Sequence, residues 1–205
     1  MTRLEFFYDL TSPWTYLGFT GILPIAQRYE LAIEWRPILV GGVFNAVNQS
    51  VYAQREAAFS DKRRMTYMMK DLKNWAELRG IAINWPRFHP VNGVKCMRGS
   101  LVAAEHKLLV PYSKAIFEAY WGRCEDVSDD RVLADCVTAL GMDSDAFLAR
   151  LAEQDIKDQL RANTDELIAR GGFGSPTLYI DGDDMYFGND RLPLVEQKLA
   201  SLAPG

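Results

Sequence analysis

Cysteine is scarce in this sequence, and its spacing excludes two classes of protein. Among 205 residues there are three cysteines, Cys96, Cys124 and Cys136, and they contain no Cys-x-x-Cys pair. An odd number of widely separated cysteines excludes a disulfide framework and a zinc ribbon, and it is typical of a reducing compartment. We therefore expect buried, unreactive thiols in a cytoplasmic protein.

Histidine, basic blocks and long apolar runs are also missing. The two histidines, His89 and His106, have no partner residues at metal-ligand spacing and no accompanying G-x-S-x-G motif, so we expect both to be capping or solvated residues rather than catalytic ones, and we expect no metal site. A net charge of −4 without a Lys/Arg-rich block argues against nucleic acid as a partner. No apolar stretch is long enough to cross a membrane, and residues 1–20 carry acidic groups, unlike a secretory signal.

The first forty residues, in contrast, predict a β-α-β unit. Residues 4–8 form a short apolar run typical of a buried strand, and a polar break leads to Ser12, which stands at a helix N-cap position before a proline. A helix over 13–29 and a second strand over 31–38 follow. Pro37 indicates that this second strand lies at an edge of the sheet.

The long middle of the chain predicts helices only. A glycine pair at 41–42 ends the β-α-β pattern. A stripe of Met, Leu and Trp side chains over 65–76 stops at Gly80 and is expected to face the core. Further helices are expected over these ranges: 94–109, 112–121, 131–140, and 145–170 with a break near 155.

Strands return after a second glycine pair, at 171–172. Residues 177–180 and 185–187 predict a hairpin, and Asn189 or Asp190 can cap a last helix. This order of elements predicts an α/β fold, a thioredoxin-like domain with a large all-helical insertion. The expected domains are a thioredoxin-like domain formed by 1–42 and 171–205, and an inserted helical domain over 43–170.

Residues 12–15 occupy the place where a thioredoxin-like domain carries Cys-Pro-x-Cys, but they read Ser-Pro-Trp-Thr. Without a thiol pair, dithiol exchange is not possible at this position. The positive end of a helix still binds anions and stabilises thiolates. Ser12 is therefore the candidate catalytic residue, with a hydroxyl that can donate to a thiolate supplied by a ligand; the alternative is an ordinary N-cap.

Two further turns complete the predicted site. Pro176 directly precedes the third strand, where thioredoxin-like folds place a cis-proline, and the backbone of Ser175 can then pair with an extended peptide. The alternative is a trans proline that starts the strand. Asn189, Asp190 and Arg191 can hold a ligand that carries both an ammonium and a carboxylate, as the γ-glutamyl end of glutathione does; the alternative is a plain cap beside a solvated arginine.

Several motifs together resemble the 2-hydroxychromene-2-carboxylate isomerases, which are related to kappa-class glutathione transferases in the DsbA-like branch of the thioredoxin superfamily. The strongest motif, residues 6–18, reads Phe-Phe-Tyr-Asp-Leu-Thr-Ser-Pro-Trp-Thr-Tyr-Leu-Gly. Residues 174–177 and 187–191 also agree, with weaker agreement over 71–81 and 88–98. The resemblance implies a glutathione-dependent cis–trans isomerase of an aromatic degradation route, and it suggests a homodimer.

The resemblance also implies a role for each site residue. Ser12 would lie over the glutathione sulfur, Ser175 and cis-Pro176 would pair with the cysteinyl part, and residues 189–191 would hold the γ-glutamyl end. In this family the glutathione thiolate is thought to add to a conjugated substrate. The former double bond rotates, and the thiol then leaves, so that glutathione is not consumed.

One segment departs from the family pattern. The family carries a lysine after the second strand that helps to hold the substrate carboxylate, and Asn45 stands in its place. Loss of such charge-assisted pairing is worth roughly 1.5–3 kcal/mol. The candidate substrate contacts are Asn45, Asn48 and Asn92, and the first two can equally be turn formers. Arg55 and Arg98 are alternative ligands for a carboxylate.

Three other functions stay open on the sequence. A glutathione transferase or peroxidase would use the same thiolate but would consume glutathione. A non-catalytic thioredoxin-like binding module would tolerate the loss of Ser12. A disulfide oxidoreductase of the DsbA type ranks last, because both cysteines of its motif are absent.

Overall fold

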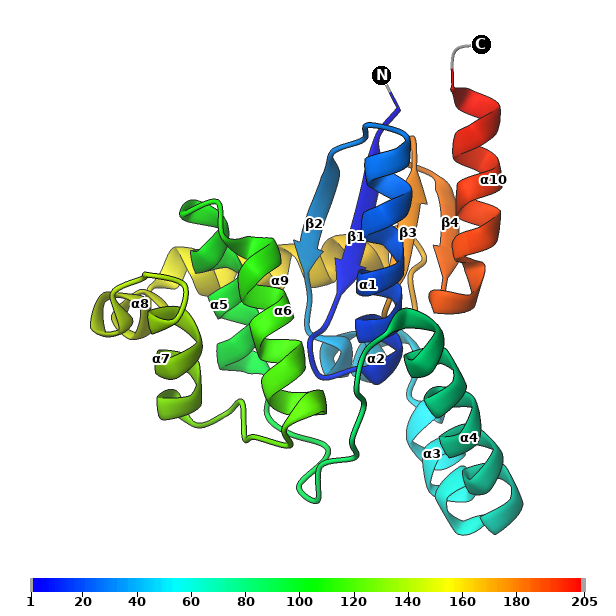
Figure 1. The fold of residues 1–205 in the computed structure, drawn as a ribbon, viewed down its shortest axis with the longest axis horizontal. Helices are drawn as coiled ribbons and strands as arrows, with labels where there is room; N and C mark the ends of the chain where they lie inside the picture. Colours follow the sequence, from blue (N-terminus) through cyan, green and yellow to red (C-terminus); the bar gives the residue numbers. More distant parts are fainter. Residues whose placement is uncertain (1, 204–205) are drawn as a thin grey trace.

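The centre of the molecule is a four-stranded sheet in the order β2-β1-β3-β4 (Figure 1). The computed structural model describes residues 2–203, without the side chains of 55, 58 and 59. The strands are β1 (Leu4–Tyr8), β2 (Ile33–Pro37), β3 (Thr177–Ile180) and β4 (Asp184–Phe187). Strand β2 is parallel to β1, whereas β3 is antiparallel to both β1 and β4. The strand that contains Pro37 therefore lies at an edge, as predicted.

Helices cover both faces of this sheet. The bounds of the helical elements in the described chain are α1 (Pro13–Arg28), α2 (Val40–Val47), α3 (Ser50–Ser60), α4 (Lys62–Arg79), α5 (Val94–Glu105), α6 (Leu109–Phe117), η1 (Glu118–Gly122), α7 (Asp130–Thr138), α8 (Ser144–Arg150), α9 (Gln154–Ala169), η2 (Asn189–Arg191) and α10 (Leu192–Leu202). In Figure 1, α1 lies in front of the sheet and α9 passes behind it, while α3 and α4 form a hairpin that projects from the body.

The alternation of side chains along β1 explains the two packed faces. Leu4, Phe6 and Tyr8 point into the main core, together with α1, α10 and the inserted helices. Phe7 points to the other face and packs with Leu167 of α9. The thioredoxin-like fold predicted from the order of elements is confirmed, because the sheet joins the β-α-β and β-β-α halves.

Some of the expected helix boundaries were wrong. The glycine pair at 41–42 lies inside α2, so the domain boundary proposed at residue 42 falls within a helix. The helix expected over 94–109 ends at Glu105, because Lys107 adopts a positive φ of 61°. The break expected near residue 155 is present but lies slightly earlier, at 151–153, between α8 and α9.

Two expectations about helix packing and capping also fail in part. Leu72 and Ala76 of the Met, Leu and Trp stripe are buried as expected, but Met69 is exposed. Neither Asn189 nor Asp190 caps α10, because a 3₁₀ turn over 189–191 precedes it and Arg191 stands at its N-cap without a side-chain bond.

The helix predicted over 112–121 changes into a π-helix, η1, after Phe117. Its residues Tyr120 and Trp121 are fully buried. The indole N–H of Trp121 donates to the carbonyl of Leu10 at 3.1 Å. This bond connects the inserted helices directly to the loop between β1 and α1.

Candidate active site

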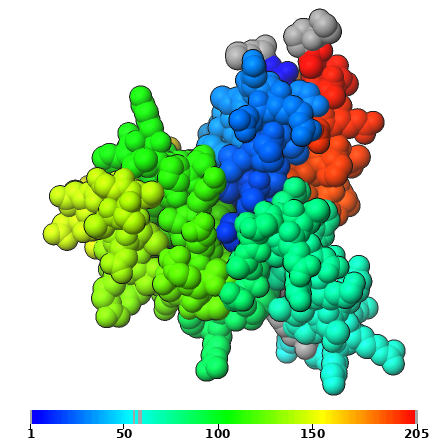
Figure 2. All heavy atoms as spheres, viewed as in Figure 1, coloured from blue at the N-terminus to red at the C-terminus, as the bar shows by residue number. Residues whose placement is uncertain are grey.

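A cavity of about 790 Å³ opens at the N-terminal end of α1. Its walls come from the β1–α1 loop, from α2 and α3, from the connector at 85–94, and from the turns on either side of the β3–β4 hairpin. In Figure 2, dark-blue atoms from the first part of the chain are visible where the green helices meet the teal hairpin. The cavity thus lies between the sheet and the inserted helices.

Ser12 begins α1 and lines this cavity. Its backbone is extended, and its Oγ accepts a hydrogen bond from the backbone N–H of Thr15 at 3.2 Å. The N-cap interpretation is therefore correct as far as it goes. A hydroxyl that accepts one bond still has its own hydrogen to donate, so Ser12 can cap the helix and donate to a ligand atom at the same time.

The turn before β3 packs tightly against α1. The Ser175–Pro176 peptide bond is cis, as predicted, and Ser175 lines the cavity. The Oγ of Ser175 accepts the backbone N–H of Asp9 at 3.0 Å and lies 2.7 Å from the Thr15 Oγ1. Gly18 allows this close approach, because a Cβ there would lie 2.9 Å from the Pro176 side chain.

Asp9 is a cavity residue that the sequence reading passed over as part of a polar break. Its carboxylate accepts the N–H and the Oγ1 hydroxyl of Thr11 at 2.8 and 2.7 Å, and the N–H of Val40 at 2.8 Å. Burial raises the pKa of Asp9, and these hydrogen bonds offset part of the rise. Asp9 therefore fixes the loop before Ser12 to the first turn of α2.

Six aromatic side chains form a further part of the wall. Their grouping could not be predicted from the sequence, because they lie far apart in the chain and share no period. They are Trp14, Phe44, Tyr52, Trp85, Phe173 and Phe187, together with Met68 from the stripe that was expected to face the core. Such a wall suits a flat apolar ligand.

Two of the three residues predicted to contact the substrate line the cavity, and the third does not. Asn48 and Asn92 line the cavity, and the Asn48 amide donates to the carbonyl of Phe173 at 3.1 Å. Asn45 does not line the cavity, although its side chain accepts a bond from the cavity residue Tyr52 at 2.8 Å. Arg98 is also elsewhere, with its guanidinium 3.5 Å from the Leu151 carbonyl. The Arg55 side chain lies outside the described part of the chain.

Residues 189–191 lie beside α1, next to the cavity residue Phe187, but they do not line the cavity themselves. Asp190 and Arg191 are exposed and pair with each other at 2.6 Å. Asn189 is buried, and within the described chain its side-chain nitrogen has no hydrogen-bond partner. The structure thus places Ser12 and Ser175 in the wall of the same cavity. Residues 189–191 lie beside that cavity, against α1.

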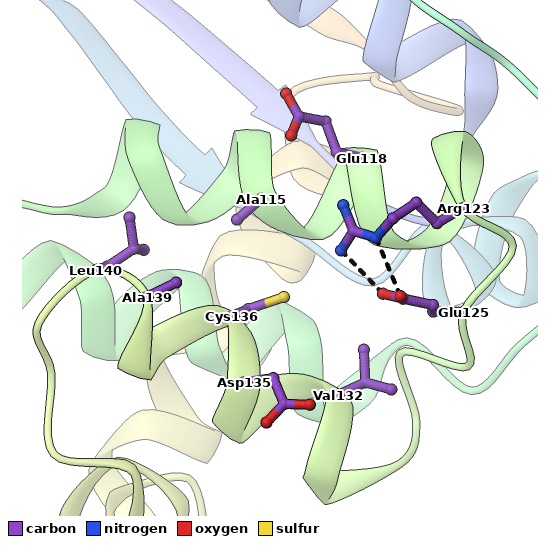
Figure 3. Close-up of a pocket in the computed structure, with 9 residues that line it drawn as sticks. All are labelled: Ala115, Glu118, Arg123, Glu125, Val132, Asp135, Cys136, Ala139 and Leu140. Atoms are coloured by element: carbon purple, nitrogen blue, oxygen red, sulfur yellow. Dashed lines mark hydrogen bonds and ion pairs between the residues drawn. The ribbon is translucent and has the colours of Figure 1, made fainter.

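A second cavity, of about 380 Å³, lies between α6 and α7 (Figure 3). The Arg123 guanidinium pairs with Glu125 at 2.9 Å across its rim, and Cys136 points toward its interior. Burial raises the pKa of the Cys136 thiol. A protonated thiol is a poor nucleophile, so Cys136 agrees with the expectation of unreactive cysteines.

A cis-proline turn packed on the first helix of a β-α-β/β-β-α sheet is the arrangement expected for a thioredoxin-like protein. The profile of the DSBA-like thioredoxin domain matches residues 3–200. The chain belongs to this family. Within the described residues, no helix of this DSBA-like protein combines the length and apolar character needed to span a bilayer.

The DSBA-like chain also has curated relatives. It is 28% identical to a 2-hydroxychromene-2-carboxylate isomerase of Pseudomonas putida, over 97% of this chain and 95% of the relative. It is 26% identical to glutathione S-transferase kappa 1 of Homo sapiens, over 96% and 90% of the two chains. A solved 2-hydroxychromene-2-carboxylate isomerase matches with a TM-score of 0.86 at 28% identity, covering 98% of this chain and 95% of that one. The resemblance stated from the motifs is therefore confirmed.

Proposed function

We propose that this protein is a glutathione-dependent cis–trans isomerase of the 2-hydroxychromene-2-carboxylate isomerase type. The observation that carries the proposal is the position of Ser12, at the N-terminus of α1 and in the wall of an aromatic cavity that also contains Ser175. Relatives of this chain include a 2-hydroxychromene-2-carboxylate isomerase and a kappa glutathione transferase.

The residues present fit glutathione at two places. Ser12 presents a hydroxyl beside the first N–H groups of α1, which favour an anion. The Asn189 side-chain nitrogen is buried without a described partner, next to the exposed charges of Asp190 and Arg191. We propose that residues 189–191 hold the γ-glutamyl end, and that the Ser175 backbone and Pro176 hold the cysteinyl part.

Bound glutathione would supply the thiolate that adds to, and later leaves, the conjugated carbon of a substrate. Ser12 and the N-terminus of α1 would keep this sulfur ionised near neutral pH. The aromatic wall would hold the flat substrate against it, with Asn48 and Asn92 as hydrogen-bond partners. Asn45 would act only through Tyr52.

The decisive test is ultraviolet titration of the protein with glutathione at neutral pH, in the absorption band of thiolates. Wild-type protein is expected to show a thiolate band, and Ser12→Ala is expected to lose it. Ser12→Asp separates this role from capping, because aspartate caps helices as well as serine but repels a thiolate. A band that persists in both variants would contradict the role of Ser12, and no band in wild type would contradict the cofactor. Ser201→Ala, on the exposed end of α10, is the matched control.

A glutathione transferase of the kappa type is the second candidate, because relatives of that name match nearly as much of the chain. The two activities share the thiolate and differ in its fate. Over many turnovers an isomerase leaves the glutathione concentration unchanged, whereas a transferase consumes one molecule per turnover.

We also propose that the protein is located in the cytoplasm and forms a homodimer. A reducing compartment suits its three free cysteines.

A further inference from the structure

Thr15 is a fully buried residue in the first turn of α1, and it does not line the cavity. Its backbone N–H donates to the Ser12 Oγ at 3.2 Å. Its side-chain hydroxyl lies 2.7 Å from the Ser175 Oγ, in the turn before β3. One buried residue is therefore bonded to the two serines, Ser12 and Ser175, that line the cavity.

The side chain of Ser175 is held from two sides. Its Oγ accepts the backbone N–H of Asp9 at 3.0 Å and forms a second hydrogen bond with the Thr15 hydroxyl. Either hydroxyl of this pair can be the donor, and both arrangements give the Ser175 Oγ two partners. Ser175 is 8% exposed, and hydrogen bonds shielded from water are electrostatically stronger. The side chain is thus fixed between the end of β1 and the start of α1.

The turn also contacts α1 at a second point, where the Pro176 ring packs on Gly18. Thr15 and Gly18 are three residues apart and so lie on one face of the helix. Apolar contact is not directional, so the contact at Gly18 does not by itself fix the turn along α1. A hydrogen bond weakens steeply when its length or angle changes. The bond at Thr15 therefore determines where the cis-proline turn sits on the helix.

We propose that Thr15 is a positioning residue, whose hydroxyl fixes the cis-proline turn relative to the N-terminus of α1 and thereby places the sulfur of a thiol peptide at Ser12. This role rests on the proposed function, in which the backbone of Ser175 pairs with the cysteinyl part of glutathione. Because one methylene group separates the sulfur from that backbone, a shift of the turn also shifts the sulfur. Residue 15 occupies the place of the second cysteine in Cys-Pro-x-Cys, and here it supplies a hydrogen bond instead of a thiol.

The test is the pKa of the thiol of bound glutathione, taken from ultraviolet thiolate difference spectra across pH at saturating glutathione. Saturation separates the placement of the sulfur from the affinity for the peptide. Thr15→Val keeps the branched shape and the backbone N–H but removes the hydroxyl, and we expect the thiol pKa to rise by about one pH unit. Thr15→Ser keeps the hydroxyl and is expected to retain the wild-type value. Thr20→Val is the matched control, because the Thr20 hydroxyl bonds within α1, to the Tyr16 carbonyl at 2.9 Å.

A double-mutant cycle tests whether Thr15 acts through Ser175. Ser175→Ala is expected to raise the thiol pKa on its own, so the role remains testable if Thr15→Val does not fold. Because the two side chains share one bond, the double variant is expected to raise the thiol pKa by less than the sum of the single effects. Additive effects would overturn the proposed connection.

Chemical denaturation of the same variants separates positioning from stability. A variant that loses stability but keeps the wild-type thiol pKa overturns the role of Thr15 and leaves the proposed function standing. Equal rises of the thiol pKa in Thr15→Val and in the Thr20→Val control overturn it as well. Wild type without a bound thiolate contradicts the proposed function and, with it, this role.

Discussion

Two carboxylates are buried near opposite ends of β1, and the protein stabilises them by different means. Glu5 is 0% exposed and is surrounded by guanidinium groups: Arg170 at 2.7 Å, Arg3 at 3.0 Å and Arg36 at 3.5 Å. Asp9 is 3% exposed, and within the described part of the chain its donors are neutral, two from Thr11 and one from Val40. The first arrangement pairs the carboxylate with cations, whereas the described partners in the second are neutral.

The two carboxylates have different partners because they lie in different parts of the molecule. Glu5 lies away from the cavity. Its partner Arg170 also stacks over Tyr179 at 3.9 Å and so joins the end of α9 to the sheet. Asp9 lies in the cavity wall, beside the place proposed for a thiolate. The strand therefore carries a structural carboxylate at one end and a site carboxylate at the other.

The largest effect on stability is expected at Glu5. Glu5→Gln keeps the shape of the side chain but leaves three arginines without their shared carboxylate, and breaking a buried pair costs about 3 kcal/mol. Chemical denaturation would measure this loss of unfolding free energy. The control is Glu34→Gln, an exposed partner of Arg3, for which about 1 kcal/mol or less is expected. Equal losses in the two variants would contradict a special role for the buried carboxylate.

A smaller effect is expected at Thr11. Thr11→Val removes the 2.7 Å hydroxyl bond to Asp9 and should cost about 1 kcal/mol. Because that bond lowers the pKa of Asp9, its loss should raise the pKa further, which carboxyl NMR titration would detect. An unchanged pKa would mean that the neutral donors do not control the charge. Thr66→Val, on the exposed side of α4, is the control.

The smallest effect at neutral pH is expected for Asp9→Asn, and its sign depends on pH. Burial raises the pKa of Asp9 above its ordinary value of 3.8, so the folded protein binds this proton more tightly than the unfolded chain does. The resulting stability is fully present below 3.8 and is lost as the pH rises through the raised pKa. The unfolding free energy of wild type relative to that of Asp9→Asn should therefore decrease between acid and neutral pH. Unfolding free energies of the two proteins across this range would show it, and an excess stability of wild type that grows toward neutral pH would contradict it.

Much of the sheet could be predicted because local signals decided it. Residues 4–8 form β1 as predicted, and the cis geometry before Pro176 followed from its place before the third strand. Ser12 could be recognised from its position before a proline at the start of a helix. Helix ends in the insertion were predicted less well, since turns such as the one at Lys107 depend on tertiary packing.

The cavity wall could not be predicted from the sequence for a different reason. Trp85, His89 and Phe173 come from connectors without periodic patterning, and only the fold brings them to Ser12. Asp9 lies close to Ser12 in the sequence. Its bond to Val40, at the other end of the β-α-β unit, is a tertiary contact that the local sequence does not reveal. Contacts of this kind connect distant segments through side chains, and composition carries no signal for them.

The projecting α3–α4 hairpin has an evolutionary consequence. It contributes Val51, Tyr52 and Met68 to the cavity, and it is anchored to α1 through Leu72 and Ala76, which pack against Leu17. The described hydrogen bonds of Ser12, Ser175 and Asp9 join the turns of the sheet to α1 and α2, and among the described side chains none of these bonds comes from the hairpin. Substitutions in its inner face can therefore change which compound fits while the groups around Ser12 stay in place. A family built in this way can acquire new substrates by altering one hairpin and inherit its chemistry unchanged.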